Sequence, residues 1–271
     1  MYMELQNAPV EALLDSGYSQ NTINEIKSTS IEEALYERAQ LPEDELRNMG
    51  YSQEKIKLLK EYDGSPLSEN PQMREVFPNL TGSFYVAYSE KTFMEVSFMW
   101  YWDGKPFLSG SVFTDIVACG FAGTSDFNNL PCRVTLDTNN SFCLISYYSD
   151  SGTFRGNVVG EISVQNPHQH IEVKFPMSKV FNKVDAGWAQ KGTLRVRIKE
   201  ENSVGKLYSC TFAFGYGHTG VGVAIAPSIS VSTGSGFNGG VGLSFGLNTK
   251  NMFYKTMVLR SNGTHEIFEG N

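Results

Sequence analysis

The stretch TFMEVSFMWYWDG, residues 92–104, indicates a β fold, because its residues follow the period of two that is typical of a β-strand. The same period recurs from about residue 82 onward, with no helical pattern between the segments. The expected strands are 83–88, 92–102, 107–118, 132–136, 142–149, 154–164, 169–175, 193–199, 206–216, 221–232, 239–248 and 252–260. Asp103-Gly104 predicts a hairpin turn after the second of them. We therefore expect an antiparallel β-sandwich or barrel.

The chain before this region is helical in character, and we expect about four short helices there. Two stretches repeat at a spacing of 33 residues, Leu13–Ile23 and Leu46–Ile56. In each, a glycine is expected to end one helix in the left-handed conformation, a tyrosine to pack back, and a serine to cap the next helix. The composition divides the chain into an acidic helical segment (1–63), a linker (64–80) and an antiparallel β domain (81–271).

Charge separates the same parts. Residues 1–75 hold 15 acidic and 7 basic residues, a net charge of −8, and the remainder carries +1. No segment is basic enough to hold phosphates, so we exclude a polybasic nucleic-acid binder. An apolar content of 41% excludes disordered and collagen-like classes. No run of about 18 apolar residues occurs, so we expect no transmembrane helix.

Residues 207–249 contain no Asp, Glu, Lys or Arg. Within this stretch, apolar residues alternate with Gly, Ala, Ser and Asn, which predicts a β-hairpin over 221–248 with one apolar face and one face of very small residues. The apolar positions are Val221, Val223, Ile225, Ile229, Val231, Val241, Leu243, Phe245 and Leu247. We expect these positions to serve self-association or membrane contact.

A sheet face of small, uncharged residues is expected in three situations. Another element such as the acidic helices covers it, a second subunit contacts it, or the hairpin inserts into a bilayer. The pattern resembles the stems of β-barrel pore-forming toxins, although Pro227 counts against a closed ladder.

Aromatic side chains are the first candidates for ligand or partner contact. Trp100, Trp102 and Tyr216 are the residues we select, because a stacking platform for a sugar or a protein needs such rings. Alternate members of Trp100-Tyr101-Trp102 must face opposite sides of a strand, so we expect at least one of them in the core.

A second, weaker candidate is a metal site. His168, His170 and Glu172 alternate along residues 166–173, so one strand face would present all three. Nothing in the sequence marks a further ligand, and the alternative is a polar strand edge. We therefore expect no metal.

No catalytic residues can be assigned from the sequence. There is no G-x-S-x-G, and both matches to G-x-G-x-x-G, at 215–220 and 234–239, lead into strands where the nucleotide fingerprint needs a helix. We expect no cofactor. Cys132 and Cys143 flank a turn-like segment that would bring a disulfide pair together, but we expect buried free thiols, with the disulfide as the alternative.

The stretch LPEDELRNMGYSQEKI, residues 41–56, ending in LKEYDG at 59–64, resembles the N-terminal segment of poorly characterised secreted proteins of Gram-positive, largely anaerobic bacteria. The resemblance implies an extracellular or envelope-associated setting. Residues 1–5 lack the basic and apolar regions of a secretory signal, so we expect no leader within the sequence itself, which departs from what the resemblance implies.

Together these observations predict a non-enzymatic, secreted or envelope-associated β protein that acts through protein–protein contact or self-association. Its expected partner is another protein or a second copy. One alternative is a membrane-active, pore-forming protein that uses the 221–248 hairpin, with residues 1–75 as an inhibitory cap. A second alternative is a hydrolase or a carbohydrate-binding protein.

Overall fold

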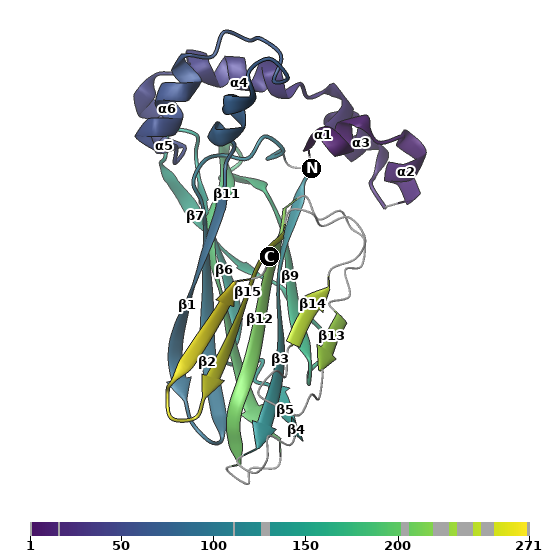
Figure 1. Cartoon of the computed structure of the whole chain (residues 1–271), viewed down its shortest axis with the longest axis vertical. Helices are drawn as coiled ribbons and strands as arrows, with labels where there is room; N and C mark the ends of the chain where they lie inside the picture. Colours follow the sequence, from purple (N-terminus) through teal and green to yellow (C-terminus); the bar gives the residue numbers. More distant parts are fainter. Residues whose placement is uncertain are drawn as a thin grey trace.

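The computed structural model describes residues 2–15, 17–110, 112–125, 131–201, 206–218, 228–231, 241–244 and 252–269. They form two antiparallel sheets packed face to face, with the helices gathered at one end of the sandwich (Figure 1). The expected class, mainly β with a helical N-terminal segment, is confirmed. None of the helices in the described ranges combines the length and the apolar character that crossing a membrane requires.

The helical segment contains more helices than the expected four. They are α1 (Tyr2–Asn7), α2 (Val10–Asp15), α3 (Gln20–Ser28), α4 (Ile31–Gln40), α5 (Glu43–Asn48), α6 (Gln53–Lys60) and the 3-10 helix η1 (Pro71–Val76).

The repeated stretches form as their residues predict. Gly17 and Gly50 both take the left-handed conformation, with φ of +86° and +98°. The tyrosine after each glycine is buried, and the serine that follows caps α3 or α6 by accepting a hydrogen bond from the backbone N–H three residues later.

The helices pack as two groups. Side chains of α1 to α3, including Leu5, Leu13 and Ile26, belong to the same buried cluster as the sandwich core. Helices α4 to α6 and η1 build a second cluster of their own. Part of the stretch expected to be a linker is packed into this second cluster, because Leu67 and Val76 are buried there.

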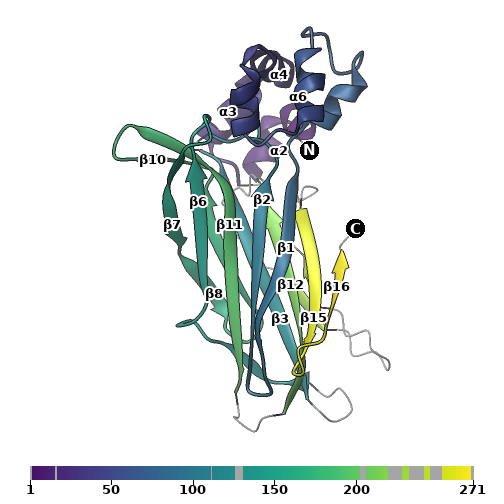
Figure 2. The same cartoon turned by 90° about the vertical axis from the view of Figure 1, so that its left-hand side faces the viewer.

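Sheet A has the strand order β1-β2-β11-β6-β7, with β5 and β10 also pairing with β11 (Figure 2). Sheet B has the order β16-β15-β12-β3-β9-β8, with β4 pairing with β3. The strands of sheet A are β1 (Leu80–Ser89), β2 (Phe93–Trp102), β5 (Val134–Leu136), β6 (Phe142–Tyr148), β7 (Phe154–Gly160), β10 (Ser178–Phe181) and β11 (Asp185–Glu200). Those of sheet B are β3 (Thr114–Ser125), β4 (Pro131–Cys132), β8 (Ile162–Asn166), β9 (His170–Pro176), β12 (Leu207–Gly217), β15 (Met252–Arg260) and β16 (His265–Glu269).

The hairpin expected at Asp103-Gly104 is wrong. Strand β2 lies in sheet A and β3 in sheet B, so the chain crosses between the sheets here instead of folding back. The Asp103 carboxylate accepts hydrogen bonds from Lys55 Nζ, at 2.9 Å, and from the backbone N–H of Asn79, which fixes the crossing to the helical segment. The strand expected at 107–118 is β3, displaced to Thr114–Ser125 by this crossing.

Two further strands pair with each other apart from both sheets: β13 (Ser228–Val231) and β14 (Val241–Ser244). The register places Ile229 opposite Leu243 and Val231 opposite Val241. The expected hairpin pairing is therefore confirmed for these residues. Val221, Val223, Ile225, Phe245 and Leu247 lie outside the described residues.

Strand β14 lies next to β12 and β3 of sheet B, on the side of the sandwich, whereas the acidic helices lie at its end (Figure 1). Ala118 on β3 and Ala213 on β12 are buried, although they lie outside the main core cluster. The described strands of this hairpin therefore lie away from the acidic helices (Figure 1).

Candidate binding face

The alternation along β2 decides which aromatic rings reach the surface. Trp100 and Trp102 point into the sandwich and are 2% and 6% exposed. Met99 and Tyr101 point the opposite way and are 40% and 38% exposed. We call the surface of sheet A that faces away from sheet B the outer face of sheet A. This face therefore carries Tyr101, the tyrosine between the two tryptophans.

The three rings selected from the sequence come together, but in the core. The Tyr216 ring centroid lies 5.6 Å from that of Trp100 and 6.0 Å from that of Trp102. The Tyr216 hydroxyl accepts a hydrogen bond from Trp102 Nε1 at 3.2 Å and donates one to the buried carboxylate of Asp115. His218 Nδ1 lies 2.9 Å from the same carboxylate. Burial raises the pKa of Tyr216 far above its ordinary value, with Asp115 adding to the effect. These residues build a polar network inside the sandwich.

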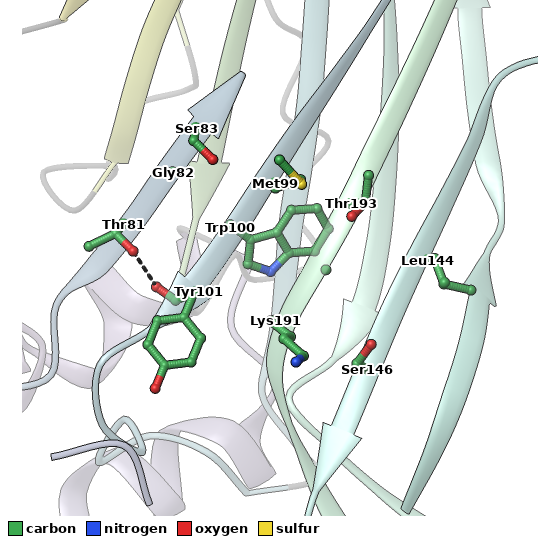
Figure 3. Close-up of a pocket in the computed structure, with 11 residues that line it drawn as sticks. Thr81, Gly82, Ser83, Met99, Trp100, Tyr101, Leu144, Ser146, Lys191 and Thr193 are labelled. Carbon is green, nitrogen blue, oxygen red and sulfur yellow. Dashed lines mark hydrogen bonds between the residues drawn. The ribbon is translucent and has the colours of Figure 1, made fainter. Parts of the chain in front are cut away.

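A groove with a volume of about 390 Å³ crosses the outer face of sheet A over β1, β2, β11 and β6 (Figure 3). The strand register explains its walls. One row of neighbouring side chains runs Thr81, Tyr101, Lys191, Ser146, and the next runs Ser83, Met99, Thr193, Leu144.

The floor between these rows consists of residues whose side chains point inward or are absent. Gly82 and Gly192 pair with Trp100 from either side, and all three positions face the core, so the outer side of this row carries no side chain between the two walls. Gly192 is required here, because a Cβ atom at this position would lie 2.3 Å from Cζ2 of the Trp100 indole. The floor of the groove is thus backbone, and Gly192 leaves room beneath it for the Trp100 indole.

Cations line the outer side of β11 and stack on aromatic rings. The Arg195 guanidinium lies 4.9 Å from the centroid of the Phe142 ring, and that of Arg197 lies 4.8 Å from the Phe93 ring. Both arginines share the buried carboxylate of Glu95, at 3.5 Å and 2.7 Å. One carboxylate for two guanidinium groups leaves this trio with a net positive charge, and cation–π contact holds the flat groups against the face.

Lys191 brings a further cation to the groove. Its Nζ lies 5.0 Å from the centroid of the Tyr148 ring, and in the described part of the chain no carboxylate is within ion-pair distance of it. Burial raises the pKa of the neighbouring Tyr101, an effect that Asp103 strengthens and Lys191 opposes. The groove therefore offers hydroxyl groups, an aromatic ring, a thioether and one uncompensated positive charge.

The weak metal candidates do not share one strand face. His168 precedes β9, where its backbone N–H binds Asn166 Oδ1 and its ring lies 3.0 Å from the carbonyl of Val134. His170 and Glu172 lie on β9 and are buried. Burial lowers the pKa of His170 and raises that of Glu172, which Lys174 partly opposes. Among the described residues, no three His, Cys, Asp or Glu side chains gather as a metal site would require.

The cysteine pair is not bridged. Cys132 lies on β4 of sheet B and Cys143 on β6 of sheet A, and both are free thiols. Burial raises the pKa of Cys143, so this thiol is a structural part of the core.

Comparison with known proteins gives only slight likenesses. No family model matches the chain, and no curated protein matches it. AvmM, which catalyses macrocyclization in alchivemycin A biosynthesis, aligns at 10% identity over 71% of this chain and 90% of its own, with a TM-score of 0.28. The collagen-binding subdomain of the Enterococcus faecalis surface protein ACE aligns at 8% identity, covering 52% of this chain and 84% of its own, with the same score. A collagen-binding domain from a Staphylococcus aureus adhesin aligns at 12% identity over 55% and 89%, with a TM-score of 0.27. None of these likenesses carries an argument about function.

Proposed function

We propose that this chain is a non-enzymatic binding protein that recognises a protein partner through the outer face of sheet A. The observation that carries the proposal is the groove together with the exposed aromatic and cationic side chains that continue from it. Tyr85, Tyr88 and Phe154 extend this exposed set beyond Met99 and Tyr101. Tyrosine, methionine and arginine are the residues enriched in protein interfaces, where they supply most of the binding energy.

The form of the face supports a binding role. Its arginines are held flat by aromatic rings and by Glu95, so little side-chain entropy remains to be lost when a partner docks. The groove gives such a partner a place to insert one side chain as an anchor. A secreted or envelope-associated setting is part of the proposal and rests on the resemblance of residues 41–64.

Position-specific photo-crosslinking tests this function. Benzoylphenylalanine is placed at Tyr101, within the groove, or at Phe268, an exposed position on the edge strand β16. Each purified protein is irradiated with a cell-envelope protein extract of a Gram-positive anaerobe. We expect discrete protein adducts from position 101, lost on Lys191→Glu, and none from position 268. No adduct from position 101, or equal adducts from both positions, would refute the proposal.

A second candidate function is membrane activity of the β13–β14 hairpin. The register favours it, because apolar residues lie opposite apolar ones, and Ser230 lies opposite Gly242, as an amphipathic hairpin requires. Dye release from liposomes, measured before and after proteolysis near residues 64–71, tests it. No release under either condition across several lipid compositions would rule this candidate out.

A further inference from the structure

The helical segment carries an exposed tyrosine among carboxylates. Tyr36 on α4 is 45% exposed, and its ring lies against Gly64, where a Cβ atom would be 3.3 Å from the ring. Glu33 and Glu37 lie three residues before and one after it, so helical spacing places all three on one side of α4. We call these three residues the acidic knob.

The acidic knob points away from its own sandwich. Arg38, on the opposite side of α4, stacks its guanidinium 4.1 Å from the centroid of the Phe107 ring and donates hydrogen bonds to the carbonyls of Lys105 and Pro106. The buried residues of α4, such as Leu35, lie on this same side. Arg38 thus holds its side of α4 against the sandwich, and the three residues of the knob are exposed on the other side.

The groove and the acidic knob are complementary in charge. The groove supplies Lys191, with Arg195 beyond Thr193 on the same side of β11, and the knob supplies Glu33 and Glu37. The asymmetry extends to the whole chain, since residues 1–75 carry a net charge of −8 and the remainder +1. An aromatic ring with flanking carboxylates suits a groove with a thioether, a phenol and an unpaired ammonium group.

We propose that the acidic knob of one copy docks in the groove of a second copy of this chain. This inference rests on the proposed function, because it assigns an occupant to the same face. The contact joins two different surfaces, so it is heterologous, and each added copy leaves one free knob and one free groove. Association therefore proceeds head to tail and grows with protein concentration.

The test uses the purified full chain, with mass measured by light scattering after size exclusion and by sedimentation. We expect the mass to rise with concentration at low ionic strength and to fall to that of the monomer in about 1 M salt, where the Debye length is about 3 Å. The groove variant Lys191→Gln/Arg195→Gln and the knob variant Glu33→Gln/Glu37→Gln should each weaken association about tenfold or more.

Mixing the groove variant with the knob variant tests whether the two surfaces bind each other. The groove variant retains an intact knob and the knob variant an intact groove, so an equimolar mixture should form a dimer with twice the mass of the chain and nothing larger. The control Glu43→Gln/Asp44→Gln removes the same charge from α5, where Arg47 pairs with both carboxylates, and should leave association unchanged.

A wild-type chain that stays monomeric at low salt, or variants that stay monomeric when mixed, would overturn the inference. It would also fall if the α5 control lost association as fully as the knob variant. Retention of a monomeric wild type on a polygalacturonate gel, abolished by the groove variant, would assign the groove to acidic glycans instead. Adducts from Tyr101 with a different protein would leave the proposed function standing while this occupant is rejected.

Discussion

Replacing Gly192 with alanine should strain the floor of the groove. The new methyl group would lie 2.3 Å and 2.6 Å from two carbons of the Trp100 indole and 2.7 Å from the Leu144 carbonyl oxygen. Favourable separations between carbon atoms are about 3.5–4.0 Å, so the ring must move. Its neighbours Phe175 and Tyr216 already pack against it, with ring centroids 5.8 Å and 5.6 Å away.

The expected cost follows from two opposing effects. Overpacking a filled core costs about 1–3 kcal/mol, and three close contacts argue for the upper part of this range. Restricting the unfolded chain by replacing a glycine returns about 0.4–1 kcal/mol. The net loss is about 2 kcal/mol, which for a chain of this size lowers Tm by roughly 4–8 °C.

Thermal and urea unfolding of Gly192→Ala measure this loss. Gly110→Ala is the matched control, because the nearest atoms to its new methyl group lie 3.7 Å away, and it should lose no stability. Trp100→Phe removes the two overlapping carbons, so in that background Gly192→Ala should cost at least about 1 kcal/mol less. Wild-type stability in Gly192→Ala would contradict the predicted clash with Trp100, as would free-energy changes of the two substitutions that add to within about 0.5 kcal/mol in the double variant.

Three other changes test the electrostatics and the attachment of the helices. Glu95→Gln leaves two partly exposed arginines without their shared counter-charge and should lower the free energy of unfolding by about 1–3 kcal/mol in urea denaturation, whereas Glu90→Gln should not. Burial lowers the pKa of His170, so the unfolded chain binds its proton more readily, and stability should fall as the pH drops below about 6.5. His170→Gln should remove this part of the pH dependence, and an unchanged slope would contradict it. Arg38→Ala should speed amide exchange across α4 to α6 about tenfold or more, because a stacked, charged donor to two carbonyls is lost, while Arg74→Ala should leave that exchange unaltered.

The helical repeats were predictable because their signals are local. A glycine that must take positive φ, a tyrosine after it and a serine cap act within a few residues, so Gly17 and Gly50 identify the helix ends without knowledge of the rest of the fold.

The hairpin predicted at Asp103-Gly104 is wrong because the structure there depends on a contact that is remote in sequence. The Asp103 carboxylate binds Lys55, 48 positions earlier in the chain, and this long-range contact outweighs the local preference for a hairpin.

Some features of the outer face of sheet A could be predicted from the sequence, and others could not. Along residues 93–102, the even positions are Met94, Val96, Phe98 and the two tryptophans, whereas Glu95 and Ser97 occupy odd ones. This parity assigns the tryptophans to the core and Tyr101 to the surface, and it is present in the sequence alone. The groove could not be predicted from the parity of one strand. Gly82 and Gly192 lie 110 residues apart, and each is an ordinary glycine until the register of β1 and β11 sets both against Trp100. The groove is lined by residues of four strands, and pairing between strands remote in sequence leaves no local trace, which is why only the paired sheet reveals it.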